Sequence, residues 1–184
     1  MKSGKKVIAS GGIALIAVAL LVLLDQLTKQ WAVQNLMGKP DIILIKDVLV
    51  FQYLENTGAA FGLFKNQGWL FIVFSLMFLL FGAYLFKIMP KTKRYLPLHI
   101  IIVVLLAGAI GNLIDRVMYA YVIDFIYFVP IDFPVFNVAD MYVTISTGFL
   151  ILLIILFYKD EDFAFMDKKN VEQIETDEQG NELS

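Results

Sequence analysis

Four long apolar stretches constrain the fold of this 184-residue chain more than any other feature of its sequence. Each is long enough to cross the hydrocarbon core of a bilayer, which is roughly 30 Å thick and takes about 20 helical residues. A segment surrounded by lipid must satisfy its own backbone hydrogen bonds, so each stretch is predicted to be an α-helix. The 59% share of hydrophobic residues and the mean hydropathy of +0.75 agree with a membrane protein. The predicted helices span residues 7–24, 69–86, 98–118 and 138–158.

The flanks of these stretches predict how the chain is oriented across the membrane. Basic residues favour the cytoplasmic side, and here they cluster before the first stretch and between the second and the third. We therefore expect both termini in the cytoplasm and segments 25–68 and 119–137 on the outer face. The first stretch also resembles a secretory signal peptide, but it lacks a small-residue cleavage site, so a retained helix is favoured over a cleaved signal. The basic residues are Lys2, Lys5, Lys6, Lys87, Lys91, Lys93 and Arg94.

The outer segment 25–68 is too long for a simple connection and carries structural signals of its own. Residues 42–45 and 48–53 are β-branched and aromatic and are split by Lys46-Asp47, which predicts a short β-hairpin. So small a unit cannot bury all of its apolar residues, so we expect it to lie on the bilayer surface over the helix ends. The small apolar run 58–64 predicts a short interfacial helix.

The composition changes after residue 159. Nine of the 17 acidic residues follow this point, with few large apolar residues among them. Such a segment cannot bury enough apolar surface to fold by itself. We therefore predict a membrane domain over residues 1–159 and an acidic, disordered cytoplasmic tail over residues 160–184.

The rare residue types narrow the chemistry open to the chain. It has no cysteine, which excludes thiol nucleophiles, disulfides and thiolate metal sites. Its one histidine, His99, excludes a multi-histidine zinc site and is expected to be structural. Ser75 and Ser146 fall in mid-helix without an evident base, which argues against a serine hydrolase. We predict no metal and no cofactor, and no nucleic-acid partner because no basic face with interleaved aromatic residues recurs.

Two aspartates at the outer edge of the apolar stretches are the strongest candidates for catalysis. Asp124 lies among apolar residues of the outer link, where a carboxylate needs a partner or a raised pKa. Asp140 falls in the first turn of the last helix, where Asn137 and Asp140 also fit a capping box. Both interpretations can hold, because a cap also orients the carboxylate. If the two aspartates meet, they share one proton and can act on a water and a carbonyl group as general base and general acid.

Polar residues in two other segments accompany these aspartates. Asn112 lies roughly 10 Å inside the outer end of its helix and needs a hydrogen-bonding partner. Arg116 shares a helix face with Asn112 and is interpreted equally well as an interfacial anchor or as a functional residue. Asn56 and Gly58 predict a turn.

Two further features bear on helix packing. Asp25 and Lys29 are four residues apart and predict a simple helix pair or a structural anchor. Small residues at Ala107, Gly108 and Gly111 predict that another helix approaches closely at this face.

Five short blocks occur in order along the chain, and together they resemble the lipoprotein signal peptidase family, signal peptidase II. The resemblance covers about residues 7–158 and leaves the acidic tail outside. Each block is weak alone, but five in order on one predicted side of the membrane are specific. The blocks are Asp25-Gln26-Leu27-Thr28-Lys29, Asn56-Thr57-Gly58-Ala59-Ala60-Phe61, Gly111-Asn112-Leu113-Ile114-Asp115-Arg116, Val122-Ile123-Asp124-Phe125 and Phe136-Asn137-Val138-Ala139-Asp140.

The resemblance implies a mainly helical membrane fold, with four transmembrane helices, a small extracytoplasmic β-cradle and a short mobile interfacial helix. It implies an aspartyl endopeptidase of the bacterial cytoplasmic membrane, with its site near the outer face among membrane lipids. The substrate would be a diacylglyceryl-modified prolipoprotein, cut before the lipidated cysteine, and the cyclic peptide globomycin would inhibit the enzyme. By position, Asp124 and Asp140 would be catalytic. The residues that would line the site or hold substrate are Asn56, Gly58, Asn112, Arg116 and Asn137.

Two other classes of function fit parts of the pattern. A small proton- or ion-coupled transporter would use the acidic residues as relay sites. Transporters often show repeated halves and broken helices near the membrane midplane, whereas here the acids gather at one surface and no repeat is found. A non-catalytic scaffold would make every block a cap or a helix pair.

Overall fold

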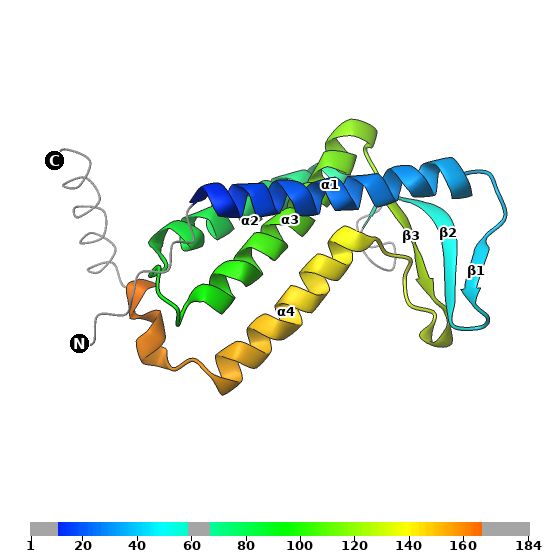
Figure 1. The fold of residues 1–184 in the computed structure, drawn as a ribbon. Coiled ribbons are helices and arrows are strands. Elements are labelled where there is room, and N and C mark those ends of the chain that lie inside the picture. The colour runs from blue at the N-terminus through cyan, green and yellow to red at the C-terminus, as the bar shows by residue number, and fades with distance from the viewer. Residues whose placement is uncertain (1–10, 59–66, 167–184) are drawn as a thin grey trace.

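The structure is a computed structural model, and it describes residues 11–58 and 67–166. Four long helices and a three-stranded sheet make up most of these residues (Figure 1). The four helices are long and apolar enough to cross a membrane, which confirms the predicted fold class. The predicted helix over residues 58–64 falls outside the described residues, apart from Gly58. The elements are α1 (Gly11–Leu36), β1 (Ile42–Ile45), β2 (Leu49–Asn56), α2 (Gly68–Ile88), α3 (Leu96–Tyr119), β3 (Val122–Phe128), the 3₁₀ helix η2 (Val129–Ile131), α4 (Val138–Leu156) and the 3₁₀ helix η3 (Asp160–Met166).

Helix α1 ends at Leu36 rather than at the predicted residue 24. The prediction ended the helix where the first charged residues, Asp25 and Lys29, interrupt the apolar run. Both side chains are buried, and the Lys29 Nζ lies 2.9 Å from Asp25 Oδ2, so the helix continues through them. Ala32 and Leu36 then pack against the sheet. The first twelve residues of the predicted segment 25–68 therefore belong to helix α1.

The sheet has the order β1-β2-β3, and both pairs of strands are antiparallel. Strands β1 and β2 form the predicted hairpin, and Asp47 in its turn has a φ of 60°. Strand β3 comes from the distant link between α3 and α4, which the sequence analysis did not predict as a strand. Its pairing with β2 places Leu54 opposite Asp124 and Asn56 opposite Val122. This pairing brings the Asn56 block beside the first candidate aspartate.

Helix α3 lies at the centre of the bundle and packs against the other three helices (Figure 1). A Cβ atom added to Gly108 would lie 2.7 Å from the Ala139 carbonyl oxygen, and one added to Gly111 would collide with Asp25 Oδ2. The predicted small-residue face is therefore confirmed. Because α1 and α4 approach α3 this closely, polar side chains of three helices can meet within the bundle.

The end of the bundle opposite the sheet carries the link between α2 and α3 and the short helix η3 (Figure 1). Phe165 of η3 is buried in a cluster with Tyr158 and Ile88. Arg94 Nη2 lies 2.6 Å from Asp162 Oδ2, and the hydrogen bonds from Arg94 lower the pKa of Asp162 to about 2. The predicted disorder from residue 160 onward is therefore wrong for residues 160–166, because their aromatic side chains pack on the helix ends. Residues 167–184 lie outside the described part of the chain.

Candidate active site

The first turn of α4 orients Asp140. Asn137 is the N-cap, and its side-chain oxygen accepts a hydrogen bond from the Asp140 backbone N–H at 3.0 Å. In return, Asp140 Oδ2 accepts from the Asn137 backbone N–H at 3.1 Å. The predicted capping box is therefore confirmed. It holds the Asp140 carboxylate at a helix N-terminus, where the helix dipole favours negative charge.

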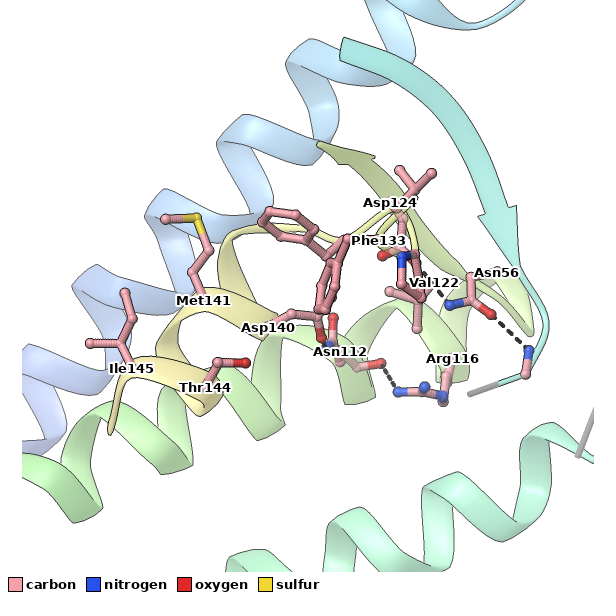
Figure 2. A pocket seen from close by; sticks show the side chains of 14 residues that line it. Asn56, Asn112, Arg116, Val122, Asp124, Phe133, Asp140, Met141, Thr144 and Ile145 are labelled. Atoms are coloured by element: carbon pink, nitrogen blue, oxygen red, sulfur yellow. Dashed lines mark hydrogen bonds between the residues drawn. The ribbon is translucent and has the colours of Figure 1, made fainter. Parts of the chain in front are cut away.

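Strand β3 holds Asp124 between two amide side chains. The Asp124 carboxylate is 1% exposed, and it accepts hydrogen bonds from Asn56 Nδ2 at 2.8 Å and from Asn137 Nδ2 at 2.7 Å. Asn56 is itself held in place, because its oxygen accepts from the Gly58 backbone N–H at 3.0 Å in the predicted turn (Figure 2). Each oxygen of Asp124 thus has one amide donor.

Asn112 and Asn137 connect the two aspartates. Asn112 Nδ2 donates to Asp140 Oδ1 at 2.8 Å, and Asn137 Nδ2 donates to Asn112 Oδ1 at 3.1 Å and to Asp124. Asn112 was predicted to need a hydrogen-bonding partner, and Asp140 accepts the hydrogen bond from its amino group. Two carboxylates from different elements, β3 and α4, are joined through two amides, which keeps them close together and limits their freedom to rotate.

The surroundings of Asp124 favour its protonated form. Burial removes the carboxylate from water, and the nearby charge of Asp140 adds to this effect, so that the pKa of Asp124 rises to about 7. The hydrogen bonds from Asn56 and Asn137 act in the opposite direction because they stabilise the carboxylate. Asp124 is therefore able to hold a proton up to neutral pH and to donate it there.

A cavity of about 590 Å³ lies between the sheet, α3 and the start of α4. Polar side chains line it around the two aspartates, and its wall continues along α4 past Met141 to Thr144 and Ile145 (Figure 2). Asn137 is fully buried and lies behind the wall, where its amide is engaged within the protein. The predicted site residues that do line the cavity are Asn56, Gly58, Asn112, Arg116, Asp124 and Asp140.

Arg116 reaches this cavity from the last turns of α3. Its guanidinium carbon lies 4.8 Å from the centre of the Phe71 ring, and its Nη1 donates to the Asn112 carbonyl oxygen at 3.4 Å. Its charge interacts with those of Asp140 and Asp124. This placement fits a functional residue better than an interfacial anchor.

A buried ionic cluster beside the site contains more residues than the predicted pair of Asp25 and Lys29. Lys29 Nζ lies 2.9 Å from each of three oxygens, which belong to Asp25, Asp115 and Asn112. The three charged residues are at most 1% exposed. The structure supports the anchor interpretation of Asp25 and Lys29, and it adds Asp115, for which no role was predicted. The available signal was the presence of charges within helices that should otherwise be apolar.

His99 lies near the other end of α3, away from the aspartates. Its Nδ1 is 2.9 Å from the Tyr95 carbonyl oxygen, and its ring packs edge-on against Phe86. The predicted structural role of His99 agrees with this placement. Among residues 11–58 and 67–166, no three His, Asp or Glu side chains are grouped so that they could hold a metal ion.

The fold and the site define a four-helix membrane protein with two linked carboxylates in a cavity at one end of its bundle. Two solved structures share this fold, and both are described as a bacterial membrane enzyme determined by the in meso method, at 2.3 Å and at 1.9 Å. They are 28% identical to this chain, with TM-scores of 0.68 and 0.69. The first comparison covers 85% of this chain and 96% of the other, and the second covers 84% and 99%.

Sequence comparisons name the family. The family model for signal peptidase (SPase) II matches residues 17–157. A lipoprotein signal peptidase of Clostridium tetani (strain Massachusetts / E88) is 42% identical, over 81% of this chain and 94% of that protein. One of Clostridioides difficile (strain 630) is 38% identical, over 78% and 95%. The chain belongs to the signal peptidase II family and is a membrane-embedded protease.

Proposed function

We propose that this protein removes the signal peptide from diacylglyceryl-modified prolipoproteins by an aspartyl mechanism, cutting before the lipidated cysteine. The observation that carries the proposal is the amide-linked pair Asp124 and Asp140 at the wall of one cavity. The relatives named lipoprotein signal peptidase support the substrate class.

The proposed mechanism uses one proton shared by the pair. Asp140, at the N-terminus of α4, takes a proton from a water molecule, whose oxygen attacks the scissile carbonyl carbon. Asp124 gives its proton to the carbonyl oxygen, which produces a gem-diol. Asp140 then passes its proton to the departing amine as the C–N bond breaks, and Asp124 recovers a proton from the gem-diol hydroxyl. Both carboxyl groups return to their starting state.

The shape of the cavity supports a lipid-linked substrate. Its polar part surrounds the aspartates, while its wall along α4 continues to Ile145, a little over one helical turn deeper. A scissile peptide at the polar part would leave an attached acyl chain or an apolar signal helix against the apolar part. We assign Asn56, Gly58 and Arg116 to substrate binding, Asn112 and Asn137 to orienting the aspartates, and globomycin to the same cavity.

We also propose how the enzyme sits in its membrane. The basic link with Lys91, Lys93 and Arg94 lies at the end opposite the sheet (Figure 1), which favours placing that end in the cytoplasm. The aspartates then face the outer side of the bacterial cytoplasmic membrane, where the sheet lies over the site. A transporter is disfavoured, because the site acids lie at one end of the bundle rather than near its middle.

The test uses purified protein and a lipidated precursor peptide. We expect Asp124→Asn and Asp140→Asn each to remain folded and to lose activity by roughly 10²–10⁴-fold, the range for loss of a general acid or base. Asp132→Asn is the matched control, because Asp132 contacts the Tyr127 hydroxyl outside the cavity. Full cleavage by either test variant would remove that aspartate from catalysis. Loss of wild-type activity on exhaustive chelation would indicate a metallohydrolase instead.

A further inference from the structure

We propose that Asp25, Lys29 and Asp115 form an ionic clamp that sets the separation of the two catalytic aspartates. This inference rests on the proposed function, because it takes Asp124 and Asp140 to be catalytic. The clamp residues themselves do not line the cavity, so the role assigned to them is one of positioning. The clamp is buried at the junction of α1, α3 and the start of α4.

Each acid of the clamp holds the backbone amide that directly precedes one catalytic aspartate. Asp115 Oδ2 accepts a hydrogen bond from the Ile123 N–H at 3.1 Å, one residue before the aspartate of β3. Asp25 Oδ1 accepts from the Ala139 N–H at 2.9 Å, one residue before the aspartate of α4. The two catalytic segments are thus attached to α3 and α1 at equivalent points.

Lys29 joins these two attachment points to each other. Its Nζ lies 2.9 Å from Asp25 Oδ2 and 2.9 Å from Asp115 Oδ2. Its third donor reaches Asn112 Oδ1, also at 2.9 Å. Because an ammonium group only donates, the Asn112 oxygen must face Lys29, and the amino group of Asn112 is then directed to Asp140. One side chain therefore fixes the distance between the two segments and the orientation of the connecting amide.

The remaining bonds show that the clamp is fully satisfied. Gln26 Nε2 donates to Asp115 Oδ1 at 3.0 Å and to Asp25 Oδ2 at 3.2 Å. Every carboxylate oxygen of the clamp therefore has a donor. Stability alone is a weak reason to bury such a cluster, because desolvation offsets much of the attraction between buried charges. Its attachment beside both catalytic aspartates points to positioning.

The separation of the aspartates matters chemically in two ways. Displacement of a reacting group by about 1 Å can lower the rate roughly 10²-fold. In addition, the charge of Asp140 raises the pKa of Asp124, and this repulsion weakens as the carboxylates move apart. A defect in the clamp must therefore change both the turnover rate and the pH profile.

The test variant combines Lys29→Met with Asp25→Asn. It removes one cation and one anion together, and it keeps an oxygen that can accept from the Ala139 N–H. We expect kcat to fall roughly 10²-fold with KM changed by less than about threefold. Loss of the Lys29 charge by itself would raise the pKa of Asp124 and move the alkaline limb of the pH profile to higher pH, but the charge of Asp140 has the larger effect on this pKa. We therefore expect the limb to move to lower pH than in wild type, because Asp124 loses its proton more readily when Asp140 is farther away.

Two further variants keep the test interpretable. Tyr142→Phe removes a 3.3 Å hydrogen bond between the Tyr142 hydroxyl and the Leu21 carbonyl oxygen, which also joins α4 to α1 but lies outside the clamp. We expect wild-type activity and an unmoved limb from it. If the combined variant does not fold, Asp115→Asn replaces it, because it keeps an acceptor for Ile123 and loses the charge facing Lys29 together with the oxygen that accepts from Gln26. We expect a smaller shift of the limb in the same direction.

The outcomes separate this inference from the proposed function. An alkaline limb that stays in place or moves to higher pH in a folded clamp variant overturns the clamp, whether or not activity falls. A purely structural defect lowers the amount of active enzyme without moving the limb, and loss of the Lys29 charge alone moves it to higher pH. If Asp124→Asn or Asp140→Asn cleaves normally, the proposed function fails first. Inactive aspartate variants together with normal clamp variants leave the proposed function standing and refute the clamp alone.

Discussion

Asn137 performs two tasks that substitution can separate. Its oxygen caps α4 through the Asp140 N–H at 3.0 Å, and its amino group donates to Asp124 Oδ1 at 2.7 Å. Serine keeps an oxygen that can cap a helix but lacks the amino group, whereas alanine lacks both. We therefore expect Asn137→Ala to lose about 1 kcal/mol of stability from the cap, and Asn137→Ser to retain that contribution.

Both variants should raise the pKa of Asp124 above its value of about 7. The hydrogen bond from Asn137 stabilises the ionised carboxylate and so lowers its pKa, and removing the bond reverses this effect. A hydrogen bond to a charged group contributes about 1.5–3 kcal/mol, and one pKa unit corresponds to about 1.4 kcal/mol. The pKa should therefore rise by roughly one to two units, so that the alkaline limb of activity moves to about pH 8–9.

The assay measures kcat/KM for a lipidated precursor peptide from about pH 5 to about pH 10, with thermal unfolding in detergent at each pH. Asn35→Ser is the control, because Asn35 is a half-buried residue of α1 outside the cavity, and its amide donates to the Trp31 carbonyl oxygen one helical turn earlier at 2.8 Å. A limb that stays at the wild-type pH in Asn137→Ser, or that moves to lower pH, would refute the reasoning.

Three further predictions concern stability and are checked by thermal or denaturant unfolding. Gly111→Ala should unfold at lower temperature and lose activity, because the added methyl group collides with Asp25 Oδ2. Gly148→Ala is the control, because nothing lies within 4 Å of its new Cβ, and equal melting temperatures of the two variants would contradict the prediction. Phe165→Ala should lose about 3 kcal/mol through a buried cavity and leave KM unchanged; an unchanged stability would show that η3 is not packed as described. Folded wild-type protein keeps a proton on Asp124 up to about pH 7, whereas the unfolded chain releases it near pH 4, so wild-type stability should fall as the pH rises between these values. This fall should be smaller in Asp124→Asn, and an undiminished fall would assign it to another group.

The sequence was informative about elements whose signals are local. Hydropathy located the four helices, two β-branched and aromatic runs split by Lys46-Asp47 located the hairpin, and spacing identified the capping box of Asn137 and Asp140. The order of the polar blocks identified the family. These features depend on residues that lie within a few positions of one another, so periodicity and spacing describe them directly.

The features that were missed depend on contacts between distant segments. Strand β3 exists because β2 pairs with it, and the sequence between α3 and α4 alone does not show that partner. Helix α1 continues past Asp25 and Lys29 because α3 supplies Asp115 and Asn112 to satisfy them. Without those partners, charged residues at the end of an apolar run indicate the edge of a membrane. The aromatic residues of η3 were likewise hidden within an acidic composition.

The buried positions of α1 all lie along one line of that helix. Asp25, Lys29, Ala32 and Leu36 are separated by four, three and four residues, which keeps them at nearly the same angle around the axis. The first two belong to the ionic clamp, and the last two support the sheet. One residue inserted between Lys29 and Ala32 would rotate Ala32 and Leu36 by roughly 100° around the helix axis and move the sheet away from the cavity. The number of residues between these two pairs in α1, and not only their chemical type, therefore determines how the sheet is aligned with the ionic clamp beside the site.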